Sequence, residues 1–241
     1  MSLPRLPILL LPGLGCTAEI WSAQLPQLWG RGPVTIADHT GGDSIAAIAA
    51  AILATAPPRF ALAGISMGGY LAFEIWRQAR ARVLGLALVD TSARPDTPEA
   101  TERRRAAIAL AEAGRFELAL SQSFPTAVHP DHVQDAALKA LHLRMNRATG
   151  VPAWRRQQQA IIGRVDSRPD LPGIDVPSLV LVGDADALTP PELSHEMAAA
   201  LPDGQLVTIP QAGHLALAEQ PETTTAALLA WLHRVAAKPG I

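Results

Sequence analysis

Hydrophobic residues gather in six short runs along the chain: Ile8–Leu11, Val34–Ala37, Phe60–Ala63, Val83–Val89, Ser178–Val182 and Gln205–Ile209. Each run is nearly all apolar and lacks the alternation of polar and apolar positions found in half-exposed strands. This pattern is typical of β-strands that are covered on both faces. Segments of helical length, such as 43–56 and 67–80, separate several of the runs. The order of strand, helix and strand predicts a mostly parallel central sheet with helices on both faces.

A long stretch, residues 92–170, shows helical periodicity interrupted by prolines and no strand pattern. We interpret it as a helical cap inserted into a core that comprises residues 1–91 and 171–241. In an open parallel sheet, ligands bind at the carboxyl ends of the strands. Functional side chains are therefore expected in the loops that follow the hydrophobic runs.

The turn Gly64-Ile65-Ser66-Met67-Gly68-Gly69 joins a hydrophobic run to a helical segment. A serine alcohol acts as a nucleophile only when a base removes its proton and the chain presents its oxygen. A sharp turn between strand and helix presents the serine, and glycines at 64 and 68 leave room for the strained backbone. The sequence therefore predicts Ser66 as a catalytic nucleophile. A glycine-rich turn with a capping serine is the alternative.

A base for Ser66 is sought among seven histidines. His214 follows the last hydrophobic run, which places it at the same edge of the predicted sheet as Ser66. The other histidines lie in helical segments, in the cap or in the loop at 38–42, which Asp38 is expected to order. We therefore predict His214 as the base, with a structural histidine as the alternative.

The base needs a carboxylate that holds it in one tautomer. Asp186 follows the run at 178–182, and its position between Ser66 and His214 in the chain matches the order used by triads of this kind. Asp184, in the same loop, is interpreted as a residue that orders the loop. Asp90, after the run at 83–89, is a third candidate for the acid.

A third requirement is a pair of donors for the oxyanion. The run at 8–11 leads into the turn Pro12-Gly13-Leu14-Gly15. A dinucleotide-binding turn is disfavoured because Ala18 stands where a third glycine is expected. We predict instead that the amides of Leu14 and Met67 form an oxyanion hole.

Composition narrows the classes of protein. The 241 residues include 20 Lys and Arg against 22 Asp and Glu, and 49% are hydrophobic, which is typical of a globular protein and not of a nucleic-acid binder. No apolar run approaches the roughly 18–20 residues that span a bilayer, and no secretory signal is evident. A lone cysteine, Cys16, favours a reducing compartment. We expect a cytoplasmic protein that acts on a small molecule without a cofactor, membrane or nucleic acid.

The cap carries 12 Lys and Arg against 9 Asp and Glu, a net +3, whereas the rest of the chain carries −5. Arginines at 103–105 and 155–156 could clamp a substrate carboxylate, although arginine runs on helices are more often solvated. Candidate substrate-binding residues are Trp21, Trp154 and Arg103, with packing as the alternative for Trp154. The motif at 129–132, His-Pro-Asp-His, has a metal-like spacing but is more typical of a loop, so no metal site is expected.

Taken together, these motifs resemble the α/β-hydrolase family over essentially the whole chain. The resemblance rests on the turn at 12–15 with Trp21 beyond it, the segment at 38–44, the serine turn at 64–69, the acid loop at 183–190 and the segment Gly213-His214 with Glu219 to Glu222. Within the family, the sequence is similar to small carboxylesterases and 3-oxoadipate enol-lactonases. The family's nucleophile, acid and base correspond to Ser66, Asp186 and His214.

Two departures from the family pattern stand out. Pro12 occupies the position of a usual histidine, which leaves open how the oxyanion turn is supported. Few residues precede the first central strand, so the family's first antiparallel hairpin is expected to be missing. The resemblance implies hydrolysis of a carboxylic ester or lactone through an acyl-enzyme. Cleavage of a carbon–carbon bond or a thioester, and a catalytically silent binding module, are the alternatives.

Overall fold

The computed structural model describes residues 5–238, whose six strands form one parallel sheet in the order β2-β1-β3-β4-β5-β6. The strands are β1 (Ile8–Leu11), β2 (Val34–Ile36), β3 (Phe60–Ile65), β4 (Val83–Val89), β5 (Ser178–Gly183) and β6 (Gly204–Ile209). Each predicted run is a strand, with ends within two residues of the prediction. Every strand pairing among residues 5–238 is parallel.

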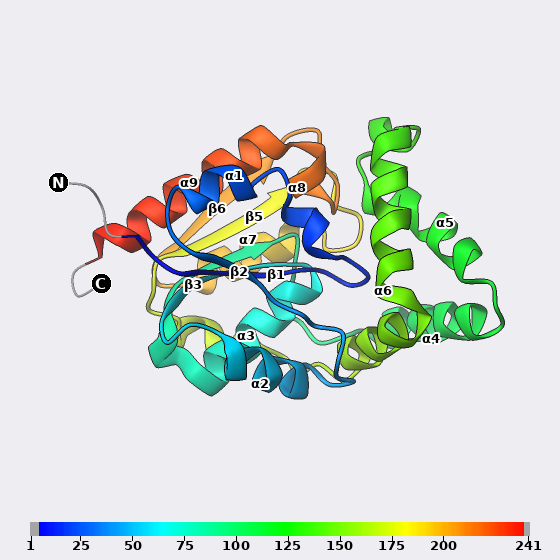
Figure 1. Ribbon diagram of the computed structural model, residues 1–241, viewed down its shortest axis with the longest axis horizontal. Coiled ribbons are helices and arrows are strands. Elements are labelled where there is room, and N and C mark those ends of the chain that lie inside the picture. The colour runs from blue at the N-terminus through cyan, green and yellow to red at the C-terminus, as the bar shows by residue number, and fades with distance from the viewer. Residues whose placement is uncertain (1–4, 239–241) are drawn as a thin grey trace.

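Helices cover both faces of the sheet (Figure 1). One face carries α1 (Leu25–Trp29), α8 (Ala216–Glu219) and α9 (Pro221–Ala237). The other face carries α2 (Ile45–Thr55), α3 (Met67–Ala79) and α7 (Pro191–Ala200). Short 3₁₀ helices are η1 (Ala18–Trp21), η2 (Arg80–Arg82), η3 (Pro130–His132) and η4 (Arg168–Gly173). Within residues 5–238, no helix combines the length and the apolar character needed to cross a membrane.

The uniform apolar pattern of the inner strands has a simple cause. Along β1, Ile8 and Leu10 pack into the core layer beneath α9, whereas Leu9 and Leu11 pack into the layer beneath α3. Because successive side chains point to opposite faces, a strand covered on both faces needs apolar residues throughout. The edge strands β2 and β6 are only partly buried, so the expected coverage of both faces holds for the four inner strands alone.

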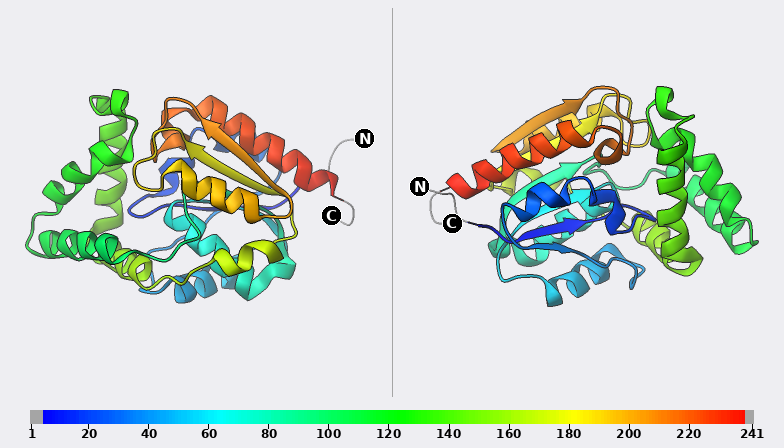
Figure 2. Two further views of the ribbon diagram at one scale, coloured as in Figure 1. Left: turned by 180° about the vertical axis from the view of Figure 1, so that it is seen from behind. Right: turned by 45° about the horizontal axis from the view of Figure 1, so that its top comes forward.

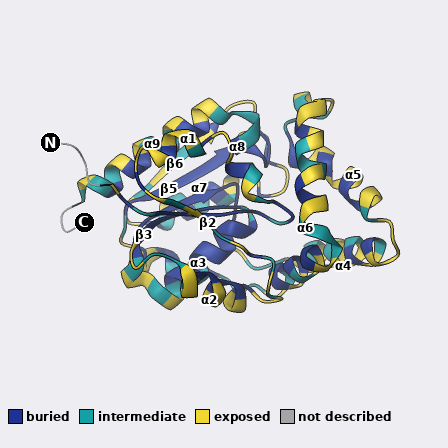
Figure 3. Cartoon of the chain, in the orientation of Figure 1, coloured by how far each residue is buried: buried dark blue, intermediate teal, exposed yellow. Residues whose placement is uncertain are grey.

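Between β4 and β5 the chain forms α4 (Pro98–Glu112), α5 (Phe116–Ala127) and α6 (Ala136–Ile162). These helices stand beyond one end of the sheet, as Figures 1 and 2 show, and we call residues 92–170 the cap. Thr97 caps α4 by accepting a hydrogen bond from the Ala100 N–H. α6 bends at Gly150, whose φ is +74°. Figure 3 shows many exposed positions on the cap helices, whereas the strands of the sheet are largely buried.

Candidate active site

Ser66 lies in a strained turn between β3 and α3. Its φ is +54° and its ψ is −116°, a conformation that non-glycine residues rarely adopt. A Cβ on Gly64 would lie 2.2 Å from the Gly68 carbonyl oxygen, and a Cβ on Gly68 would lie 2.2 Å from that of Leu11. The glycines therefore allow the turn to close tightly. Thr91 holds it by donating a hydrogen bond to the Ser66 carbonyl oxygen at 2.8 Å.

Ser66, His214 and Asp186 form one chain of hydrogen bonds. The Ser66 Oγ and His214 Nε2 atoms are 2.8 Å apart, and His214 Nδ1 lies 2.8 Å from Asp186 Oδ2. His214 comes from the loop between β6 and α8, and Asp186 from the loop between β5 and α7. Both side chains are buried. The structure thus brings together three residues that lie far apart in the sequence.

The Asp186 carboxylate is fully engaged by its surroundings. Its oxygens accept hydrogen bonds from the backbone N–H groups of Leu188 and Thr189 and from the Thr189 hydroxyl. Burial alone would raise the pKa of Asp186, but the nearby His214 and these hydrogen bonds outweigh it and lower the pKa. Asp186 is therefore an anion beside the histidine ring, as a group that orients an imidazole must be.

The other acids near the triad have different partners. Asp184 accepts hydrogen bonds from the N–H groups of Gln211 and Ala212, so it orders the loop as expected. Asp90 is buried, and its two oxygens accept hydrogen bonds from the N–H groups of Gly183 and Ala216. Burial, together with the charge of Asp186, raises the pKa of Asp90. Asp90 therefore links the two loops that carry Asp186 and His214, and makes no hydrogen bond to the His214 ring.

The turn at 13–15 packs directly against the Ser66 turn. A Cβ on Gly13 would lie 3.3 Å from both the Ile65 carbonyl oxygen and the Ser66 Cβ. The amides of Leu14 and Met67 donate no hydrogen bond to another group in residues 5–238. Met67 is the first residue of α3, where the backbone amide has no partner within the helix. Both predicted oxyanion donors are thus unpaired.

Sequence reasoning missed the support of this turn. His39 Nε2 donates a hydrogen bond of 2.8 Å to the Gly13 carbonyl oxygen, and the Gly15 N–H donates to Gln157 Oε1 at 2.9 Å. Burial lowers the pKa of His39, which keeps the ring neutral. His39 thus provides the support that Pro12 cannot, and its position after β2 was the available signal. Asp38, as expected, orders its own loop by accepting hydrogen bonds from Thr40.

Glu219 is a second residue whose role sequence reasoning missed. Its carboxylate accepts hydrogen bonds from the N–H of Gly213, next to the His214 base candidate, and from the N–H of His129 in the cap. His132 Nδ1 lies 2.8 Å from the same carboxylate. The motif at 129–132 therefore joins the cap to the loop of His214, and Pro130–His132 within it form the 3₁₀ helix η3. Residues 5–238 contain no cluster of three or more His, Cys, Asp or Glu placed to hold a metal ion.

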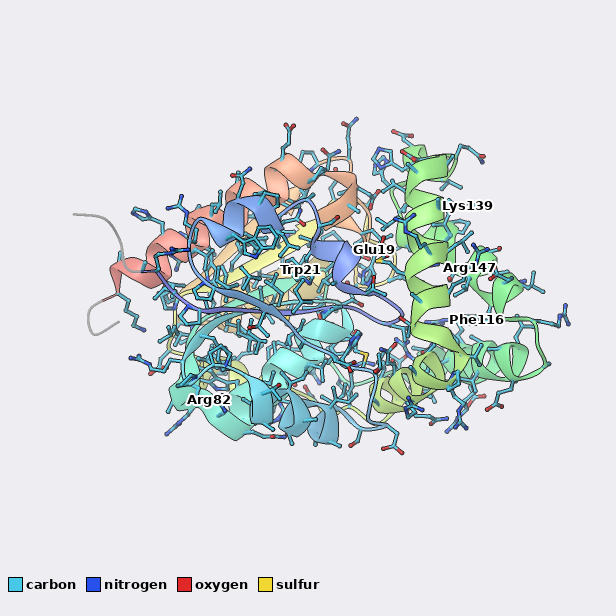
Figure 4. The ribbon with its side chains drawn as sticks, viewed as in Figure 1. Glu19, Trp21, Arg82, Phe116, Lys139 and Arg147 are labelled. Carbon is cyan, nitrogen blue, oxygen red and sulfur yellow. The ribbon has the colours of Figure 1, made fainter. Side chains whose placement is uncertain are left out.

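A cavity of about 550 Å³ opens above Ser66 and is roofed by the cap. Leu14, His214, Trp154 and Arg103 line it together with Ser66. Trp154 also packs edge-to-face on Phe116, with ring centroids 5.3 Å apart. Trp21, labelled in Figure 4, is fully buried in the core and does not line the cavity. Of the three predicted substrate-binding residues, the structure therefore brings Trp154 and Arg103 to the cavity.

The fold and the hydrogen-bonded triad define a class of hydrolase, and the comparisons with known proteins agree with it. Residues 8–228 match the model of the alpha/beta hydrolase family. The chain belongs to this family, which confirms the resemblance and the fold expected from the sequence.

Individual relatives cover nearly the whole chain. A Variovorax paradoxus protein with the provisional name carbamate hydrolase RutD is 30% identical, over 97% of this chain and 94% of its own length. The pimeloyl-[acyl-carrier protein] methyl ester esterase of Edwardsiella ictaluri is 28% identical, over 92% and 91%. The structure of a thermophilic esterase from Thermogutta terrifontis has a TM-score of 0.86 and 32% identity, covering 96% of this chain and 91% of that one.

Proposed function

We propose that this protein is a serine hydrolase that cleaves a carboxylic ester or lactone of a small molecule through an acyl-enzyme. The observation that carries the proposal is the distance of 2.8 Å between Ser66 Oγ and His214 Nε2, with His214 Nδ1 bound to Asp186. This geometry lets the ring remove the hydroxyl proton while the carboxylate stabilises the imidazolium that results. The named esterases among the relatives support an ester as the substrate class.

In the first half-reaction, Ser66 Oγ attacks the ester carbonyl carbon and His214 takes the proton. The negative charge that develops on the carbonyl oxygen is stabilised by the Leu14 and Met67 amides, which donate to no other group of residues 5–238. Met67 also begins α3, whose N-terminus favours a negative charge. His214 then gives its proton to the leaving alcohol oxygen as the carbon–oxygen bond breaks.

In the second half-reaction, His214 removes a proton from a water molecule that attacks the acyl carbon. The same two amides stabilise the second oxyanion. When the intermediate collapses, Ser66 Oγ leaves with the proton from His214, and the carboxylic acid is released. Every proton in this cycle moves through His214, and one water molecule is consumed in each turnover.

A panel of p-nitrophenyl esters, lactones, acyl-thioesters, carbamates and diketones tests the proposal against its alternatives. We expect hydrolysis of esters or lactones that Ser66→Ala abolishes. Ser92 is a matched control because it also lines the cavity but accepts a hydrogen bond from the Arg94 N–H and not from the triad. Ser92→Ala is expected to retain most of the activity. Turnover of thioesters or diketones alone would support a rival reaction, and no turnover at all would support a silent binding module.

A further inference from the structure

We propose that Arg103, Arg104 and Arg164 form a carboxylate-binding subsite in the cap wall of the cavity, so that the preferred ester or lactone carries a carboxylate away from the bond that breaks. This inference rests on the proposed function, because it names the substrate class of the same cavity. The three arginines come from two parts of the cap, α4 and the segment that follows α6.

The structure separates these arginines from others in the cap. Arg103 and Arg104 line the cavity, whereas Arg105, the next residue on α4, pairs with Glu102 at 2.5 Å and does not line it. The second arginine pair of the sequence also turns away. Arg155 lies 3.5 Å from Glu112, and Arg156 donates to the Thr40 carbonyl oxygen. The positive charge of the cap is therefore directed into the cavity at particular positions.

Arg104 and Arg164 share a single carboxylate. Asp96, whose side chain is 2% exposed, lies 3.2 Å from Arg104 Nε and 2.7 Å from Arg164 Nη1. Burial raises the pKa of Asp96, but the two guanidinium groups outweigh burial and lower it, so the carboxylate is an anion. The single negative charge of Asp96 thus faces the two positive charges of Arg104 and Arg164. This largely buried cluster of three side chains therefore keeps a net charge of +1.

The charged residues that line the whole cavity also favour an anionic ligand. Its lining contains four arginines, at positions 94, 103, 104 and 164, and Asp96 is the one carboxylate among them. Arg94 is neutralised from outside by Glu196, at 2.9 Å. Arg103 makes no hydrogen bond or ion pair to another group of residues 5–238. Its charge acts at longer range on the exposed Glu99, one helical turn earlier, so Arg103 adds positive charge that is only weakly compensated. A cavity with a net positive wall attracts an anionic ligand.

The guanidinium groups are also held in position. The Arg104 Nη1 atom donates to Gln158 Oε1 at 2.8 Å, and the Arg164 guanidinium lies 4.3 Å above the centre of the Tyr70 ring. No hydrogen bond within residues 5–238 uses the Nη2 atom of either arginine. Planar guanidinium donors that are fixed but incompletely used match the geometry of a carboxylate, which accepts paired hydrogen bonds.

Binding to the Ser66→Ala protein tests the subsite without requiring turnover. Calorimetry would compare the monomethyl and dimethyl esters of the linear dicarboxylic acids from succinic to suberic, which differ in one negative charge at each chain length. At the chain length that reaches the subsite, we expect the monomethyl ester to bind roughly tenfold to a hundredfold more tightly. Raising the salt concentration should reduce this preference.

Arginine variants in the same Ser66→Ala background assign the preference to particular residues. Arg103→Gln and Arg104→Gln should each reduce the preference by about tenfold. The Arg103 side chain makes no hydrogen bond or ion pair within residues 5–238, so its replacement breaks no such contact there. Arg105→Gln is the matched control on the same helix and should keep the wild-type preference. Equal binding of the two esters, binding of neither, or a preference unaltered by both Arg103→Gln and Arg104→Gln would overturn the subsite.

Failure of the subsite and failure of the proposed function give different results. If Ser66-dependent hydrolysis is absent but the monomethyl ester still binds preferentially, the ester-hydrolase proposal fails and the subsite stands. If esters are hydrolysed but charge makes no difference to binding, the subsite fails and the hydrolase proposal stands.

Discussion

Two walls of the cavity are held in place by different means. The loops of the sheet supply one wall, and the cap supplies the other. On the sheet side, Ser66, Asp186 and His214 lie in the loops that follow β3, β5 and β6. Hydrogen bonds of 2.8 Å join the three side chains to one another. On the cap side, α4 and the segment that follows α6 present arginines, and two of them, Arg104 and Arg164, are held by ion pairs with Asp96.

This difference suggests a division of labour. Reacting groups must be held closely, and the sheet wall holds each of them from more than one side. Substrate choice needs complementary charge and shape, and the cap provides both at the far wall of the same cavity. Changes to the sheet wall, to the cap and to the contact between them test this division of labour.

The largest effect is expected from Asp186→Asn, which disturbs the sheet wall at the triad. An amide in this position no longer fixes the tautomer in which His214 Nε2 can accept the Ser66 proton, so kcat should fall about 10⁴-fold. Steady-state kinetics on the best ester of the panel measures it. Asp184→Asn, in the same loop, serves as the control and should lose far less because Asp184 binds only backbone N–H groups. Similar losses in both variants would show that the loop, and not the acid, matters.

Replacing His39 tests the support of the oxyanion turn. His39→Ala removes the donor to the Gly13 carbonyl oxygen, so the Leu14 amide should lose its alignment and kcat should fall about 10²-fold with a small change in KM. Asp38→Ala, which changes the adjacent residue but not this hydrogen bond, is the control. An unchanged kcat in His39→Ala would remove His39 from the account of the sheet wall.

His142, in the cap, should make the folded protein less stable in acid. Burial lowers the pKa of His142 from 6.5 to about 4, so the unfolded chain binds a proton between these values and the folded chain does not. Stability present above pH 6.5 is therefore lost as the pH falls towards 4. Between pH 7 and pH 5, the wild-type free energy of unfolding should fall about 2 kcal/mol more than that of His142→Gln. Urea unfolding at the two pH values measures the difference, and equal losses would argue against a neutral His142.

The contact between the two walls is tested at Glu219. In the wild type, one oxygen of the Glu219 carboxylate binds Gly213 and the other binds the cap. A glutamine side chain has a single acceptor oxygen, so in Glu219→Gln either Gly213 or the cap loses its hydrogen bond. We expect a loss of about tenfold in kcat/KM. Glu222→Gln, an exposed neighbour at the start of α9, is the control. Equal kcat/KM in both variants would show that the cap and the loop of His214 act independently.

Features that depend on consecutive residues could be predicted from the sequence more fully than features that depend on long-range contacts. The strands and the serine turn could be predicted because their signals lie within a few consecutive residues. The half-buried state of β2 and β6 could not, since an apolar run does not reveal whether it lies at an edge. The loop-ordering roles of Asp38 and Asp184 also agree with the sequence interpretation, because each acts on residues near it in the chain or across one strand pair.

The parts that the sequence left open depend on groups far apart in the chain. His39 reaches Gly13, and Glu219 reaches the cap, through contacts that only the folded chain creates. Trp21 is among the predicted substrate-binding residues, but η1 turns it into the core. The arginine run at 103–105 faces several directions because adjacent helical residues lie about 100° apart, so only the packing of α4 selects those that reach the cavity.

The most direct test of the central proposal is a covalent one. Mass spectrometry of the intact protein after treatment with a fluorophosphonate should show one added phosphonyl group, and peptide mapping should place it on Ser66. The same treatment of Ser66→Ala should leave the mass unchanged. Labelling of the Ser66→Ala protein to the same extent, or an added group on another residue of the wild type, would contradict the account.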